Sequence, residues 1–341
     1  MAIFFGEQDY EHGSPDKTGI LLTNLGTPDE PTAKAVKTYL REFLSDPRVI
    51  EIPKFIWQII LRGFILQIRP RRSARTYSTI WTKEGSPLLV IAKKQLELVR
   101  KELKSTYPNS VVELAMRYGN PSVESALEKL QKQQVRRLLI FPLYPQYCAA
   151  TTASTFDAVT NVLQKWRWIP ELRFINHYYD DRSYIKALSR SIEDFWKKNG
   201  RPQKTIFSYH GIPKKYHAKG DPYHCFCLKT TRLVKEYMNL SDEEFITTFQ
   251  SRFGRAEWLQ PYTSQTLMDL PKKGVKDIHI ISPGFSADCL ETLEELEEEN
   301  RGYFEKAGGE KYKYIPCLND NSSHISMMTN LIKKHTQGWK I

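Results

Sequence analysis

One histidine of the sequence occupies the position where parallel α/β sheets carry functional residues. His210 ends the apolar run TIFSY and is followed at once by Gly211, with Pro213 two residues later. Ligands of open α/β sheets bind beyond the carboxyl ends of the strands. A neutral imidazole there can accept a proton or coordinate a borderline metal ion. The position therefore predicts a functional base or ligand, and the alternative is a histidine that only hydrogen-bonds at a strand end.

An acidic segment near the C-terminal end is the second candidate. Residues 288–299 contain seven carboxylates and no basic side chain. Helical periodicity places several on one face: Asp288, Glu291, Glu295 and either Glu298 or Glu299. Like charges along one face cost a helix roughly a few tenths of a kcal/mol per pair. The stripe favours a role in passing cations or protons, and the alternative is a solvated acidic surface helix.

Two further patterns are weaker. His210, His217 and His224 are seven residues apart, but intervening glycines and prolines exclude one helix that would align them. We interpret this spacing as accidental. Cys225 and Cys227 form a CxC pair without a second pair, so we favour free thiols over a zinc or iron-sulfur site.

The elements that must position these residues alternate regularly. Short apolar runs (TGILLTN, VVELAM, RRLLIF, TIFSY, FITTF, KDIHII) end in Gly or Pro loops and are separated by helical stretches. This predicts an α/β fold with parallel sheets covered by helices. Arg117-Tyr118-Gly119 and Arg252-Phe253-Gly254 follow strands in two corresponding places, which suggests an internal repeat. We expect two similar Rossmann-like domains, residues 18–175 and 176–318, with a ligand cleft between them; the C-terminal helix within 319–341 completes the first.

Charge and composition narrow the class of protein. The chain has 341 residues and a net charge of +11, of which +9 lies between Lys54 and Lys104. Ten of the fourteen residues 55–68 are apolar, and four arginines follow before residue 76. Such a segment is too short to span a bilayer. It is typical of a helix on a membrane surface, of the rim of an apolar pocket for an acidic ligand, or of a core helix followed by a basic turn.

Several classes of protein are not expected. Five scattered cysteines and an acidic N-terminal start argue for a reducing, cytoplasmic setting. No nucleotide-binding glycine motif is present, and the basic residues are not interleaved with aromatics as nucleic-acid binding requires.

The motifs together carry a resemblance to a known family. LLTNLGTP, FLSDPRVIEIP, RYGNP, FPLYPQYCAATTAS, FSYHGIP, GDPYHCFC, FQSRFGRAEWLQP and SPGFSADCLETLEE, in this order from about Thr18 to about His335, resemble the ferrochelatases of bacteria. The resemblance implies a lyase that inserts Fe(II) into protoporphyrin IX and releases two protons, the last step of haem synthesis. It also implies two similar Rossmann-like domains with the porphyrin in the cleft between them.

The resemblance also assigns residues. It places the family's histidine on His210 and its glutamate on Glu291, with Glu295 continuing a carboxylate path, and all three are expected around the metal. The residues expected to line the porphyrin pocket are Leu25, Ser86, Arg117, Tyr118, Tyr147, Ser251 and Trp258. Arg117 or the arginines after residue 68 are expected to pair with the propionates. Residues 50–80 correspond to the family's apolar lip, so contact with the inner face of the membrane is expected through residues 55–75.

Two departures from the family pattern have consequences. Cys289 stands where relatives often have histidine, and the last cysteine is Cys317, so no iron-sulfur cluster is expected and no cofactor beyond the substrate Fe(II). Three alternatives remain open: a non-catalytic porphyrin or haem carrier, a chelatase for another tetrapyrrole or metal such as coproporphyrin or cobalt, and a membrane-surface scaffold. The oligomeric state does not follow from the sequence.

Overall fold

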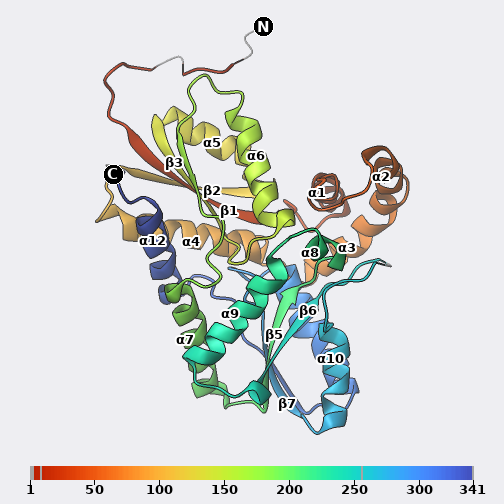
Figure 1. Ribbon diagram of the computed structural model, residues 1–341. Helices are drawn as coiled ribbons and strands as arrows, with labels where there is room; N and C mark the ends of the chain where they lie inside the picture. The colour runs from red at the N-terminus through yellow and green to blue at the C-terminus, as the bar shows by residue number, and fades with distance from the viewer. Residues whose placement is uncertain (1–3, 8–9, 255, 340–341) are drawn as a thin grey trace. The chain divides into compact units, whose positions relative to one another are not determined.

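The strands of the chain form parallel sheets. The structure, a computed structural model, describes residues 4–7, 10–254 and 256–339. In these residues the eight strands form two four-stranded sheets in which every pairing is parallel. The predicted α/β class with parallel sheets is confirmed. The chain divides into two units, each with one sheet: residues 1–143, 149–176 and 320–341 form the first, and residues 144–148 and 177–319 form the second (Figure 1).

The sheet of the first unit is built from continuous apolar runs. Its strands in spatial order are β2 (Ser110–Gly119), β1 (Lys17–Thr27), β3 (Val135–Pro142) and β4 (Glu171–Phe174). In the central strand β1, Ile20, Leu21 and Leu22 are all fully buried, as expected where helices cover both faces of a parallel sheet. The helices of this unit are α1 (Ala33–Leu44), α2 (Lys54–Ile60), α3 (Leu66–Ile80), α4 (Pro87–Lys104), α5 (Val123–Lys132), α6 (Ser154–Leu163) and α12 (Ser322–His335), with π-helical turns at Leu61–Ile65 and Ala149–Ala153.

The sheet of the second unit has the same strand order as the sheet of the first. Its strands in spatial order are β6 (Phe245–Gln250), β5 (Lys204–His210), β7 (Asp277–Ile281) and β8 (Lys311–Tyr314). The orders β2-β1-β3-β4 and β6-β5-β7-β8 correspond strand for strand, which explains the repeat seen in the sequence. Its helices are α7 (Arg182–Asn199), α8 (Lys214–Ala218), α9 (Tyr223–Tyr237), α10 (Thr263–Asp269) and α11 (Asn300–Lys306), with 3-10 turns at Asp242–Glu244 and Pro271–Lys273 and a π-helix at Glu291–Glu299.

Helix α5 is an example of a helix whose apolar residues pack against the sheet. Its apolar residues Val123, Leu127 and Leu130 recur at helical spacing and are buried against the first sheet. The Ser122 hydroxyl accepts a hydrogen bond from the Ser125 amide at 3.1 Å and so caps the helix. In the second unit a comparable core gathers residues of β5, β7, β8, α10 and α11.

The segment after α1 has two apolar faces. Trp57, Leu61 and Leu66 pack with Leu44 in a small separate core, and the Trp57 indole donates to the Leu44 carbonyl. The opposite face is exposed, as described below. Within the described ranges, no helix combines the length and hydrophobicity that crossing a bilayer requires.

Candidate functional site

His210 is the last residue of β5. Gln250, the last residue of β6, lies beside it in the parallel register. The His210 Nδ1 is 2.7 Å from the Gly211 carbonyl oxygen. Because a carbonyl can only accept, Nδ1 donates this hydrogen bond, and in the neutral ring Nε2 is then the nitrogen with the lone pair. A side chain at position 211 would place its Cβ 2.9 Å from the Gln250 carbonyl oxygen, so glycine is required for this approach of the two strand ends.

The acidic segment forms a π-helix, not the α-helix that the sequence predicted. Glu291–Glu299 follows the i→i+5 hydrogen-bond pattern, which places more residues in each turn than the 3.6 of an α-helix. This winding keeps Glu291 and Glu295 on neighbouring positions of one face, whereas Glu298 moves away from that face. Such π-helical turns occur frequently at functional sites.

Glu295 lies between the π-helix and the loop after β6. Its carboxylate accepts hydrogen bonds from the Ser251 amide at 2.8 Å and the Ser251 hydroxyl at 2.5 Å. Removal from water raises the pKa of Glu295 above the ordinary value, and the Glu291 charge raises it further; the Ser251 hydrogen bonds and the charge of His210 oppose this change. The structure thus brings four predicted residues together: Ser251, His210, Glu291 and Glu295.

Gln250 holds this arrangement, and sequence reasoning missed it. Its Nε2 donates to the Glu291 carbonyl at 3.0 Å and reaches a Glu295 carboxylate oxygen at 3.5 Å. Its Oε1 accepts from the Ser208 hydroxyl at 2.7 Å. The sequence did contain one signal for Gln250: it is a polar residue at the end of an apolar strand, directly before Ser251.

Asp288 does not belong to the predicted carboxylate stripe. It is buried ahead of the π-helix and accepts hydrogen bonds from Tyr314 Oη at 2.5 Å, Asn319 Nδ2 at 2.6 Å, and the Cys317 amide at 3.2 Å. The carboxylate joins the start of the acidic segment to the loop after β8. Its role is therefore structural, because all its acceptor positions face neighbours within the unit.

Trp258 lies near His210. The two ring centroids are 6.4 Å apart with planes inclined by 50°. The indole is partly buried, and its Nε1 has no hydrogen-bond partner among the residues described. An unpaired donor beside a flat ring suits a polar or aromatic ligand. Tyr147 also belongs to the second unit, where it is partly buried.

Four predicted pocket residues belong to the first unit. Leu25 is partly buried near the carboxyl end of β1, and Ser86 is buried and accepts from the Thr27 hydroxyl at 2.9 Å. Arg117 and Tyr118 lie near the carboxyl end of β2, where both side chains form hydrogen bonds with other residues of this unit.

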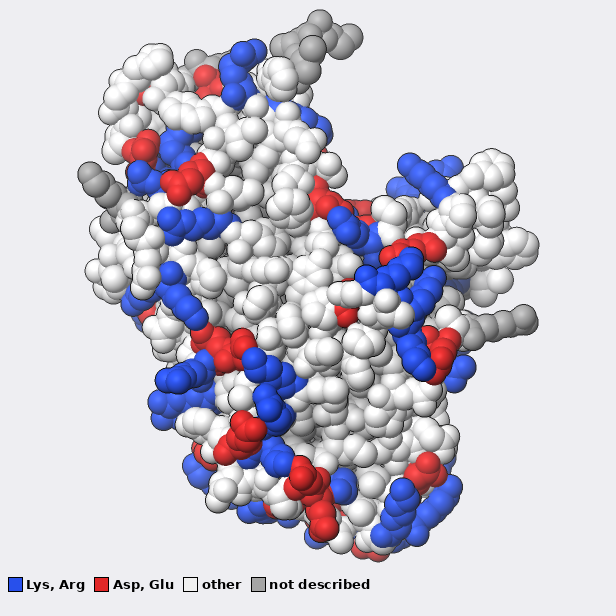
Figure 2. Space-filling view, in the orientation of Figure 1, with Lys and Arg blue, Asp and Glu red and all other residues white. Residues whose placement is uncertain are grey.

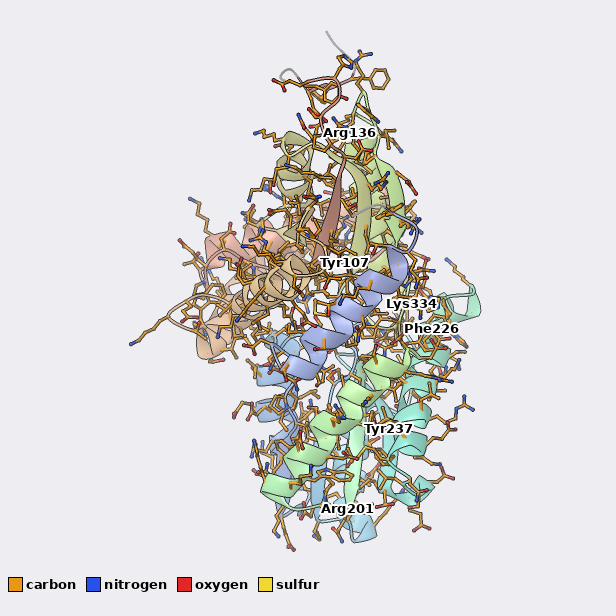
Figure 3. The ribbon with its side chains drawn as sticks, turned by 90° about the vertical axis from the view of Figure 1, so that its left-hand side faces the viewer. Tyr107, Arg136, Arg201, Phe226, Tyr237 and Lys334 are labelled. Carbon is orange, nitrogen blue, oxygen red and sulfur yellow. The ribbon has the colours of Figure 1, made fainter. Side chains whose placement is uncertain are left out.

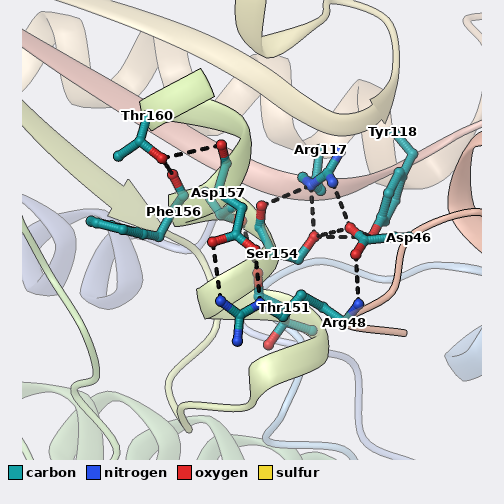
Figure 4. A network of polar contacts seen from close by, with 10 residues as sticks. Asp46, Arg48, Arg117, Tyr118, Thr151, Ser154, Phe156, Asp157 and Thr160 are labelled. Carbon is teal, nitrogen blue, oxygen red and sulfur yellow. Dashed lines mark hydrogen bonds and ion pairs between the residues drawn. The ribbon is translucent and has the colours of Figure 1, made fainter. Parts of the chain in front are cut away.

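A polar network ties Arg117 and Tyr118 to Asp46 (Figure 4). The Arg117 guanidinium pairs with the Asp46 carboxylate at 2.5 Å and donates to the Ser154 hydroxyl at 2.6 Å, and the Tyr118 phenol donates to Asp46 at 2.8 Å. Burial raises the pKa of Asp46, but hydrogen bonds from Ser154, Arg48 and Tyr118 with the Arg117 charge outweigh it, so the pKa is lowered. The Arg117 guanidinium thus has a carboxylate partner within its own unit, and its pairing with a propionate stays a prediction.

The cysteines occupy different environments. Cys225 is exposed and Cys227 is buried, because residues two apart on helix α9 point to opposite sides; the CxC pair is therefore not a common metal site. Burial raises the pKa of the Cys289 thiol well above its ordinary value, so it stays protonated. Across the described residues, no three His, Cys, Asp or Glu side chains are grouped so as to hold a metal ion. A metal role for His210, Glu291 and Glu295 therefore stays a prediction.

Comparisons with known proteins identify the family of the chain. The family profile described as Ferrochelatase matches residues 17–336. A protein of Marinobacter nauticus named Ferrochelatase is 56% identical over 337 residues, covering 98% of this chain and 91% of that protein. A protein of Shewanella oneidensis named Ferrochelatase 2 is 55% identical over 324 residues, covering 95% and 99%.

Solved structures show the same fold at low sequence identity. SirB from Bacillus subtilis with Fe3+ aligns with a TM-score of 0.57 and 12% identity, covering 94% of this chain and 96% of that one. CbiX, described as the terminal enzyme of sirohaem biosynthesis in denitrifying bacteria, aligns with a TM-score of 0.50 and 13% identity, covering 93% and 98%. The likeness shows a chelatase-type fold, and the family profile with the close relatives goes further: the chain belongs to the ferrochelatase family.

Proposed function

We propose that this protein inserts Fe(II) into protoporphyrin IX, forming haem and releasing two protons. Family membership supports the reaction, and one observation within the chain carries it. The Nδ1 of His210 is held by the Gly211 carbonyl, and the ring lies close enough to Glu295 for their charges to interact; burial raises the pKa of that carboxylate. A base beside a proton-accepting carboxylate is what the reaction requires.

The two inner N–H groups of a free porphyrin block the metal. For each iron inserted, both N–H bonds break, two Fe–N bonds form at those nitrogens, and both protons leave. In the proposal His210 Nε2 accepts a proton, and the negative charges of Glu291 and Glu295 stabilise the imidazolium. The raised pKa of Glu295 suits it to take the proton onward. The same carboxylates favour the approach of Fe(II), the substrate cation.

Trp258 and Gln250 complete the proposed site. The indole near His210 supplies a flat apolar wall for the macrocycle. Gln250 acts as a positioning residue, because its amide fixes the π-helix backbone at Glu291 and contacts Glu295.

We propose in addition that residues 55–75 contact a membrane surface. Phe55, Phe64 and Ile68 expose 79%, 64% and 71% of their surface. Exposed arginines follow on the same stretch: Arg62, Arg71, Arg72 and Arg75. Figure 2 shows basic side chains beside uncharged ones over α1, α2 and α3. An apolar face flanked by cations suits the interface of an anionic bilayer. In the proposal the protein receives the hydrophobic porphyrin from this membrane surface.

The decisive experiment is anaerobic mixing of the protein with protoporphyrin IX and Fe(II), followed by the haem absorption band. We expect haem with the wild type and a loss of roughly 10²- to 10⁴-fold in kcat for His210→Ala, with unchanged porphyrin affinity. His177→Ala, which changes an exposed histidine, is the matched control and should retain activity.

Three outcomes would reject the proposal. Porphyrin binding without insertion by the wild type would indicate a carrier. Insertion only into coproporphyrin, or only of cobalt, would indicate a different chelatase. Full activity of His210→Ala would remove the histidine from the mechanism.

A further inference from the structure

Two histidines outside the proposed proton-handling site have their rings in contact. His217 lies in α8 and His224 in the first turn of α9, the helix that carries Phe226 and Tyr237 of Figure 3. The ring centroids of the two histidines are 5.2 Å apart and the ring planes are inclined by 81°. No helix joins them, as the sequence predicted, yet the intervening loop brings them together.

Hydrogen bonding leaves ligand atoms on both rings. The His217 Nδ1 is 3.3 Å from the Asp221 carbonyl oxygen, so Nδ1 carries the proton and Nε2 keeps its lone pair. A ring held in this way by a backbone carbonyl is the usual arrangement of a metal-binding histidine. In the described part of the chain, neither ring nitrogen of the partly buried His224 has a hydrogen-bond partner.

We propose that His217 and His224 together bind one divalent first-row transition-metal ion. With metal–nitrogen bonds of about 2.1 Å and a near-tetrahedral angle, two imidazoles on one ion have ring centroids roughly 5 Å apart. The observed centroid separation of 5.2 Å agrees with this value. Imidazole nitrogen suits zinc, cobalt, nickel, copper and iron.

The coordination sphere stays partly open. Among the residues described, no third His, Cys, Asp or Glu forms a metal-holding group with the pair, so water completes the sphere. Exposed Lys214 and Lys215 nearby on α8 weaken the attraction for a cation. We expect an exchangeable site rather than a closed structural one.

The pair lies next to the strand ends that carry the proposed site. The His224 ring centroid is 5.4 Å from that of Phe249, and Phe249 directly precedes Gln250, the register partner of His210. A metal ion bound here would be held by the same unit as the acidic π-helix.

Titration with Co²⁺ in the absence of porphyrin tests the site, using the absorption of the metal as the readout. In a His210→Ala background, which removes the other histidine of interest, we expect one Co²⁺ bound per chain with spectra of nitrogen and water ligation. Adding His217→Ala or His224→Ala should weaken binding at least tenfold. Unchanged affinity in both would overturn the proposal.

Two further variants separate ligation from folding. His224→Phe keeps an aromatic ring against Phe249 and removes the nitrogens, so it should lose Co²⁺ while retaining the thermal midpoint of the wild type. Cys225→Ser should bind Co²⁺ as the wild type does; loss of binding there would reassign the site to the thiolate. Because no porphyrin is present, this result is independent of whether haem is formed.

Discussion

At the scale of single residues, the protonation of Glu295 is the most informative property of the proposed site. The Ser251 amide and hydroxyl hold its carboxylate in place, while loss of hydration favours the neutral form. The group therefore binds a proton more tightly in the folded than in the unfolded chain. A carboxyl with this property is suited to take up a proton and release it again.

Glu295→Gln should change how stability depends on pH. Because the folded pKa is raised above the ordinary value of 4.5, its contribution to wild-type stability is fully present below pH 4.5 and is lost as pH rises through the folded pKa. The free energy of unfolding of the wild type should therefore fall relative to that of Glu295→Gln across this window. Urea unfolding from pH 4 to 8 measures it, with Glu298→Gln on the exposed surface as control; parallel curves for wild type and Glu295→Gln would contradict the shift.

His279 should give the opposite slope. It is buried in β7 with an unpaired Nδ1, and burial, with the charge of Lys313, lowers its pKa from 6.5 to about 4. The folded state binds fewer protons than the unfolded state between these values, so stability present above pH 6.5 is lost as pH falls towards 4. The loss is roughly 3 kcal/mol.

His279→Phe should remove most of this acid sensitivity. Chemical unfolding at pH 7.5 and 4.5 provides the measurement, and His12→Gln, at an exposed position, provides the control. An equal loss of stability at pH 4.5 in wild type and His279→Phe would show that other groups cause it.

At the scale of elements, the start of the π-helix depends on a buried carboxylate. Asp288 joins the residues before Glu291–Glu299 to the loop after β8. Gln250 then fixes the first turn of the same helix from the end of β6. Two separate strands thus determine where the carboxylates of the site lie.

Asp288→Ala should destabilise the protein by roughly 3 kcal/mol or more, because it leaves several buried donors unpaired. Thermal or urea unfolding measures the effect, and Glu310→Ala at an exposed position serves as control. Haem formation should fall as well, since the π-helix loses its anchor. A variant as stable as the wild type would show that water replaces the carboxylate.

At the scale of the whole molecule, residues 55–75 combine positive charge with exposed apolar side chains. Trp57 and Leu61 pack this segment onto the first unit with one face, and Phe55 and Ile68 lie exposed on the other.

Reversing the charges of this segment should weaken membrane binding. Each cation near an anionic surface contributes about 1 kcal/mol, so Arg71→Glu, Arg72→Glu and Arg75→Glu combined should lower affinity for phosphatidylserine vesicles more than a hundredfold. Sedimentation with vesicles at low and high salt measures this. Lys129→Glu, Lys132→Glu and Lys197→Glu together reverse as many charges elsewhere and should sediment as the wild type does; equal loss in both would show that only net charge matters.

Much of the architecture was predictable because it is encoded locally. Apolar runs that end in Gly or Pro are properties of a few consecutive residues, so the alternation of strands and helices, the parallel class and the place of His210 could be read directly. The acidic segment was recognised, but its winding was not. Periodicity distinguishes helix from strand, whereas an i→i+5 hydrogen-bond register leaves no comparable signature in the sequence.

The sequence by itself determined which apolar runs form strands, which family motifs the chain carries and which residue types stand at the site. Only the tertiary structure decided which partners those residues take. Arg117 meets Asp46 from 71 positions away, and His217 meets His224 through a loop that no periodic pattern describes. The physical reason is that a buried charge or ring is stabilised by whatever neighbour the packed chain brings within hydrogen-bonding or contact distance, and that neighbour is set by the folding of distant segments, not by their spacing.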